Sequence, residues 1–137
     1  MLKRIKYLII LLVIFSCEKN NNSPNIVFIL ADDLGYGDLS SYGSETIETI
    51  NIDKLAENGV KLTSYYAAQP VCSASRAAIL TGVYPNRIGI YNAFGPTSDS
   101  GISHNEYTLA EMLKDNGYKT GIFGKWHLGS KKEFFPT

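Results

Sequence analysis

The sequence is poor in several features that mark particular classes of protein. Its 13 basic and 13 acidic residues cancel, so no overall positive charge points to a nucleic-acid partner. The two cysteines allow at most one disulfide, and no internal repeat is present. The longest apolar run, at 7–15, is shorter than the roughly 20 residues that a membrane-spanning helix needs. A basic nucleic-acid-binding surface and a spanning helix are therefore disfavoured.

The composition that is present suits a globular protein. Hydrophobic residues make up 45% and aromatic residues 12% of the 137 positions, which excludes a disordered chain and fits one small domain. Three of the 13 basic residues lie in the first six positions, so the remaining ten face 13 acidic residues. The body of the chain is mildly acidic, and a site for an anion must be built from local positive groups.

The first residues resemble an export signal. Basic residues in the first six positions precede the apolar run, and Ser16 and Cys17 follow it. A small residue directly before a cysteine resembles the bacterial lipobox. We therefore predict cleavage before Cys17, attachment to a membrane through a lipid on that residue, and a location in the bacterial periplasm or outer membrane. Plain secretion is one alternative, and a disulfide from Cys17 to Cys72 is another.

These signals divide the chain into three predicted parts. They are a lipoprotein-type signal peptide at 1–16, a polar, asparagine-rich tether at 17–24 and a folded domain at 25–137. Within the domain, apolar runs that predict strands alternate with helix signals. The predicted strands are 26–31, 60–66 and 119–123. The predicted helices are Thr49 to Asn58, with Thr49 as N-cap and Gly59 as stop; Cys72 to a stop at Gly82; and the capping box of Thr108 and Glu111 to a stop at Gly117.

This alternation predicts an α/β fold, a parallel sheet with helices on both faces. Asp32 and Asp33 follow the first predicted strand, at the carboxyl end where open α/β sheets bind their ligands. The spacing of the acidic residues there does not match an EF-hand loop. A solvated acidic turn is the alternative interpretation of this segment.

Cys72 opens the second predicted helix. A helix N-terminus offers unpaired backbone N–H groups and a partial positive charge, and Arg76, about one turn further on, adds a full charge. Cys72 is therefore placed where an anion would bind. A small, half-buried cysteine without a function is the alternative.

Three segments together resemble the sulfatase family. Cys72 to Gly82 match the pattern C/S-x-P/A-S-R followed by T-G, with Ala74 where proline is usual. The turn that begins with Asp32 and Asp33 matches the family's first metal segment, and residues 124–129, Gly-Lys-Trp-His-Leu-Gly, match a second signature. The resemblance covers 25 to about 132. It implies an incomplete alkaline phosphatase-like domain, the N-terminal part of a sulfatase.

The resemblance also implies roles for single residues. Cys72 would be oxidised to formylglycine, the nucleophile, and would share a Ca²⁺ ion with Asp32 and Asp33. Arg76 and Lys125 would stabilise the nucleophile and the sulfate charge. His127 would bind a hydroxyl of the modified residue and help to expel sulfate.

The implied activity is that of a sulfuric ester hydrolase. Its substrate would be a sulfated carbohydrate or an aryl sulfate, and its partner a formylglycine-generating or anaerobic sulfatase-maturating enzyme. A phosphatase or phosphodiesterase of the same superfamily, and a non-catalytic, membrane-anchored protein that binds sulfated glycans, are the alternatives. The family's remaining metal ligands have no counterpart before Thr137, so we expect the chain alone to be inactive.

The long loop at 83–105 has two interpretations. It is rich in Gly, Pro, Asn and Ser and holds Arg87, Tyr91 and His104. It is either a rim that faces the substrate or plain surface.

Overall fold

The computed structural model of the chain describes residues 23–136. The chain divides into two compact units, Met1–Ala31 and Asp32–Thr137. The predicted signal peptide and Cys17 lie outside the described residues. Within the described part the longest helix has ten residues, and no helix there is long and apolar enough to cross a membrane.

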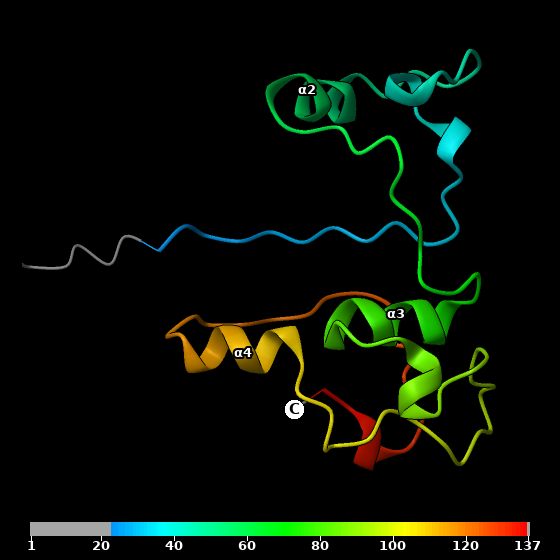
Figure 1. Ribbon diagram of the computed structural model, residues 1–137, viewed down its shortest axis with the longest axis vertical. Coiled ribbons are helices and arrows are strands. Elements are labelled where there is room, and N and C mark those ends of the chain that lie inside the picture. Colours follow the sequence, from blue (N-terminus) through cyan, green and yellow to red (C-terminus); the bar gives the residue numbers. More distant parts are fainter. Residues whose placement is uncertain (1–22, 137) are drawn as a thin grey trace, which may run out of the picture. The chain divides into compact units, whose positions relative to one another are not determined.

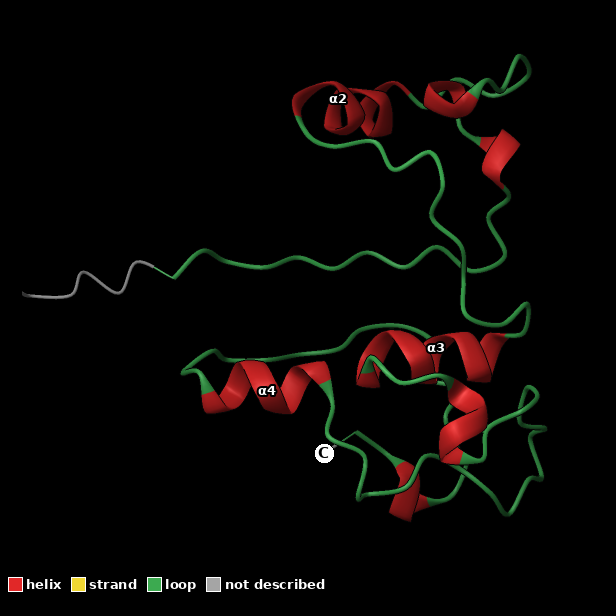
Figure 2. Ribbon diagram, viewed as in Figure 1, coloured by secondary structure: helices red, strands yellow, loops and turns green. Residues whose placement is uncertain are grey.

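The described residues of the second unit form three α-helices and four short 3-10 helices. Figures 1 and 2 draw these helices and the loops that connect them. The α-helices are α2 (Ile50–Asn58), α3 (Cys72–Thr81) and α4 (Leu109–Asp115). The 3-10 helices are η1 (Tyr36–Asp38), η2 (Ser40–Tyr42), η3 (Pro85–Ile88) and η4 (Lys132–Phe134). The three predicted helices are thus confirmed.

The helix ends follow local rules. Helix α4 begins with the predicted capping box, in which the Glu111 N–H donates to Thr108 Oγ1 and the Thr108 N–H donates to the Glu111 carboxylate. Helix α3 ends at Gly82, whose φ of 68° is the left-handed conformation of a glycine cap. Thr49 precedes α2 as predicted, but its hydroxyl donates to the Asp53 side chain and does not cap the backbone.

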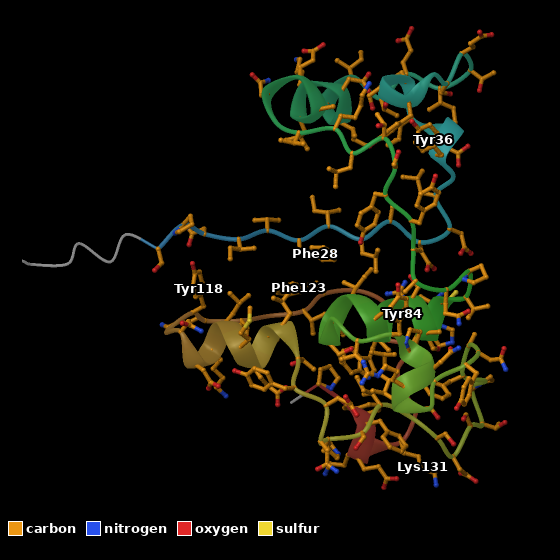
Figure 3. All side chains as sticks on the ribbon, in the orientation of Figure 1. Phe28, Tyr36, Tyr84, Tyr118, Phe123 and Lys131 are labelled. Carbon is orange, nitrogen blue, oxygen red and sulfur yellow. The ribbon has the colours of Figure 1, made fainter. Side chains whose placement is uncertain are left out.

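The predicted strands are not formed in the described part of the chain. Residues 26–31, 60–66 and 119–123 make no backbone hydrogen bonds to another segment there, and Figure 2 draws no strand. A strand needs a neighbour in register, and the apolar side chains that a sheet would bury are exposed. Val60 is 84% exposed and Phe123 is 99% exposed. Figure 3 labels Phe123. The parallel sheet therefore stays a prediction.

The buried core lies under α3. Ala74 and Ala77 on one side of the helix are fully buried against Ile90, Ile102 and Leu128. Alanine at these positions lets the loop 83–105 and the segment after Gly124 approach the helix backbone closely. The small residue Ala74, where the family pattern has proline or alanine, thus faces the core.

Replacing Gly82 with Ala tests the cap of α3. The left-handed backbone at Gly82 penalises any residue with a Cβ, although no atom lies within 4 Å of the position that the Cβ would take. We expect the free energy of unfolding to fall by about 1 kcal/mol in urea denaturation. Gly37→Ala is the control, because Gly37 also has free space but no left-handed φ. Equal losses in the two variants would contradict this interpretation.

Candidate active site

Asp32 is bound by two cations that are distant in sequence. Arg76 Nη2 donates to Asp32 Oδ1 and Lys125 Nζ donates to Asp32 Oδ2, each at 2.7 Å. Arg76 comes from α3 and Lys125 from the segment that follows the third predicted strand. The Asp32 carboxylate therefore connects its own segment to the two other segments that match the family, one through Arg76 and one through Lys125.

Arg76 also fixes the backbone of Lys125. Its Nη1 donates to the Lys125 carbonyl oxygen at 2.7 Å. The Arg76 side chain is 12% exposed, whereas the side chains of Asp32 and Lys125 are 44% and 43% exposed. The Arg76 side chain is thus the least exposed of the three, and the carboxylate and the ammonium face solvent.

These contacts shift two pKa values in opposite directions. The Lys125 ammonium, and after it the Arg76 guanidinium, hold the pKa of Asp32 below its ordinary value of 3.8. The Asp32 carboxylate raises the pKa of Lys125 above 10.5. Both groups are therefore charged across the physiological range.

Cys72 is the first residue of α3, as predicted. Val71 precedes it and makes no side-chain capping hydrogen bond, so this residue leaves the first N–H groups of the helix uncapped. Lys125 Nζ lies 3.7 Å from Cys72 Sγ. The thiol is therefore next to a positive side chain and the positive end of a helix.

Asp32, Asp33 and Cys72 form a cluster that could hold a metal ion. One ligand atom from each lies within 4.8 Å of the others. Two carboxylates suit a hard cation such as Ca²⁺, which prefers oxygen ligands, whereas a thiol does not. An oxygen in place of the sulfur at position 72 would make the set consistent. The residues present fit Ca²⁺ on this condition, and Asp32 would then exchange an ammonium or guanidinium contact for the ion.

His127 makes its hydrogen bond elsewhere, to the loop 83–105. Its Nε2 lies 2.8 Å from the Phe94 carbonyl oxygen, and the Phe94 N–H donates to Ser73 Oγ at 3.0 Å. Ser73 is fully buried. His127 and Phe94 line a cavity of about 270 Å³ together with Gly95, Pro96, Gly129 and Ser130.

Strained backbone coincides with the predicted site. Asp33 and His127, each with φ of 56°, are the non-glycine residues with positive φ in the described part of the chain. Such a conformation costs on the order of 1–3 kcal/mol and persists where surrounding contacts impose it. This backbone conformation sets the direction in which the side chains of Asp33 and His127, two predicted site residues, leave the main chain.

Other residues are separate from this group or were missed from sequence. Arg87, Tyr91 and His104 are exposed and form no hydrogen bond with the site residues within 23–136. Sequence reasoning missed Ser73 and Phe94. Ser73 falls at the variable position of the signature, and Phe94 acts through its backbone, which leaves no side-chain signal.

Comparisons with known proteins place the chain in one family. The Sulfatase family model matches residues 24–136. Human steryl-sulfatase is 47% identical over an alignment that covers 90% of this chain and 24% of that enzyme. Human arylsulfatase G is 46% identical and is matched over 89% of this chain and 23% of its own length. The chain thus spans about a quarter of the curated relatives that it matches.

These relatives also correct the predicted location. The most similar curated proteins include human steryl-sulfatase and human arylsulfatases H and G, which are eukaryotic enzymes and not bacterial lipoproteins. The lipobox interpretation rests on a few residues around Ser16 and Cys17. The prediction of a lipid-anchored protein of the bacterial periplasm or outer membrane is therefore wrong.

A solved structure superposes on most of the chain. The crystal structure of Ps i-CgsB in complex with k-i-k-neocarrahexaose superposes with a TM-score of 0.78 and 42% identity, over 82% of this chain and 25% of that one. The chain therefore shares the alkaline phosphatase-like fold of sulfatases over most of its length, although its sheet is not formed within 23–136. The family model and the named relatives agree: the chain belongs to the sulfatase family.

Proposed function

We propose that the complete protein carrying this chain hydrolyses sulfate esters, with residue 72 as the nucleophile after oxidation of Cys72 to formylglycine. The observation that carries the proposal is the position of Lys125 Nζ, 2.7 Å from the Asp32 carboxylate and 3.7 Å from Cys72 Sγ. One ammonium group thus reaches both the predicted nucleophile and a predicted metal ligand. A formylglycine-generating or anaerobic sulfatase-maturating enzyme would carry out the oxidation.

The charges of the site favour an anionic substrate only when a cation is present. The carboxylates of Asp32 and Asp33 balance the positive charges of Arg76 and Lys125, so the four side chains sum to zero. Ca²⁺ held by Asp32, Asp33 and an oxygen of residue 72 would make the site positive and act as a Lewis acid on an ester oxygen. This local positive charge would offset the excess of acidic over basic residues in the rest of the chain.

The remaining roles follow from the positions of the side chains. A hydrated aldehyde at position 72 would supply the attacking oxygen. Lys125, half-exposed and next to that position, would stabilise the charge that develops on the sulfate oxygens. Arg76 holds Asp32 and the Lys125 backbone in place. His127 would hold and release a proton beside the reacting group.

The substrate we propose is a sulfated carbohydrate or an aryl sulfate. Relatives named steryl-sulfatase and arylsulfatase, and a related structure that contains an oligosaccharide, support this class. We also infer that residues 26–31, 60–66 and 119–123 pair as parallel strands in the complete protein. Their exposed apolar side chains support this pairing.

Replacing Lys125 with Met tests the electrostatic link to Asp32. The lowered pKa of Asp32 means that its ion pairs stabilise the protein above pH 3.8 and lose this effect as the pH falls through the lowered value. Removing the ammonium should raise the Asp32 pKa toward its ordinary value, as measured by NMR titration of the carboxyl carbon in calcium-free protein. Lys131→Met is the control, because Lys131 pairs with Asp99 at 2.9 Å. The same Asp32 shift in both variants, or none in Lys125→Met, would refute the link.

The oxidation of Cys72 can be followed directly. In the complete protein expressed with a maturation enzyme, mass spectrometry of the peptide that contains residue 72 should show formylglycine. Hydrolysis of a phenyl sulfate should rise with the fraction converted, and Cys72→Ala should be inactive. Active protein that contains only unmodified cysteine at position 72 would contradict the proposal. Faster hydrolysis of a phenyl phosphate would favour a phosphatase instead.

A calcium titration separates the roles of Asp33 and Lys125. Asp33→Asn keeps the shape of the side chain but removes a charge from the cation site, so excess Ca²⁺ should partly restore turnover of an aryl sulfate. Lys125→Ala should lower kcat about a hundredfold at every calcium concentration, because the ion cannot replace a charge needed in the transition state. Rescue of Lys125→Ala by calcium, without rescue of Asp33→Asn, would reverse the two roles.

A further inference from the structure

Ser73, the residue after Cys72, ties the loop 83–105 to the first turn of α3. Its hydroxyl oxygen accepts the Phe94 N–H at 3.0 Å, and the side chain is fully buried. A buried hydroxyl in this position is costly unless it is hydrogen-bonded, so the contact fixes the Phe94 peptide group relative to residue 72.

The other end of the same peptide group determines which nitrogen of His127 carries hydrogen. The Phe94 carbonyl oxygen lies 2.8 Å from His127 Nε2. A carbonyl oxygen can only accept, so Nε2 must donate, and Nδ1 of the neutral ring holds a free electron pair. Nδ1 is buried and has no hydrogen-bond partner within residues 23–136. It is therefore the nitrogen left for a reacting group.

The backbone around His127 is held independently of this contact. Arg76 donates to the Lys125 carbonyl on one side, and the Ile102 N–H donates to the Leu128 carbonyl at 2.9 Å on the other. Leu128 is fully buried, and the φ of 56° at His127 sets the direction of its side chain. What these contacts leave undetermined is the rotation and tautomer of the ring, which the Phe94 carbonyl fixes.

We propose that Ser73 is a positioning residue for His127, an inference that rests on the proposed function of the site. Ser73 orients the Phe94 peptide group, and the Phe94 carbonyl holds His127 in the Nε2–H tautomer. Nδ1 would then be the ring atom that takes the proton of a formylglycine hydroxyl: the O–H bond breaks, an N–H bond forms, and the electron pair left on that oxygen forms the aldehyde C=O bond while the C–O bond to the departing sulfate breaks. The resulting imidazolium keeps its Nε2–H donated to Phe94, which stabilises the charge. The proton is later released to the departing oxygen or to solvent.

Nitrogen-15 NMR of labelled histidine tests the tautomer without any need for activity. In the complete protein, the neutral His127 ring should show a protonated Nε2 and an unprotonated Nδ1, with the signals assigned through His127→Gln. Ser73→Ala should give a mixture of the two tautomers. Ser98→Ala is the matched control, because within residues 23–136 the Ser98 hydroxyl bonds only to Ser100 in the same loop. An unchanged tautomer in Ser73→Ala, or the Nδ1–H tautomer in the unsubstituted protein, would overturn the proposal.

Kinetics provide a second readout. Rates on an aryl sulfate are divided by the formylglycine content of each variant, because Ser73 lies within the segment that is oxidised. We expect Ser73→Ala to lower kcat about 10-fold, to shift the pH dependence of kcat and to leave KM nearly unchanged. Ser98→Ala should match the unsubstituted protein. A changed KM with kcat and its pH profile intact would contradict a role through His127.

The two readouts separate the proposal from the function on which it rests. If the unsubstituted, modified protein does not hydrolyse an aryl sulfate, the proposed function fails. The NMR comparison of Ser73→Ala with Ser98→Ala still decides whether Ser73 orients the ring.

Discussion

The site depends on one carboxylate that is bound to cations on both oxygens. Asp32 joins Arg76, 44 residues further on, and Lys125, 93 residues further on. Ion pairs between partly exposed groups contribute little to stability on their own, because solvent screens them and long side chains lose entropy. The three segments must therefore be brought together by packing. The ion pairs then determine the orientation of groups that the fold has already brought together.

That packing is provided by the small residues of α3. Ala74 and Ala77 are fully buried against Ile102 and Leu128, which brings the segment of Lys125 and His127 next to the helix. Larger side chains there would hold the two segments apart. The same helix carries Cys72, Ser73 and Arg76, so one element places the predicted nucleophile, the hydroxyl that holds Phe94 and the guanidinium that holds Asp32.

Features set by neighbouring residues could be predicted from the sequence, and features set by distant partners could not. The Thr108–Glu111 capping box and the Gly82 cap involve residues within one turn, and both are confirmed. The strand at 119–123 is not formed within 23–136, because strand pairing depends on partners far along the chain. The motifs identified Asp32, Arg76 and Lys125, which do meet. The link from Ser73 through Phe94 to His127 runs through a peptide group, so the pattern of side chains in the sequence does not predict it.

The central claim is that Asp32, residue 72 and Lys125 form one site for a cation and a sulfate group. A crystal structure of the complete, modified protein grown with calcium and inorganic sulfate measures this most directly. The account predicts Ca²⁺ bound by Asp32 and Asp33, and sulfate in contact with residue 72 and Lys125 Nζ. Sulfate bound away from residue 72, with both oxygens of Asp32 still paired to Arg76 and Lys125 at saturating calcium, would contradict it.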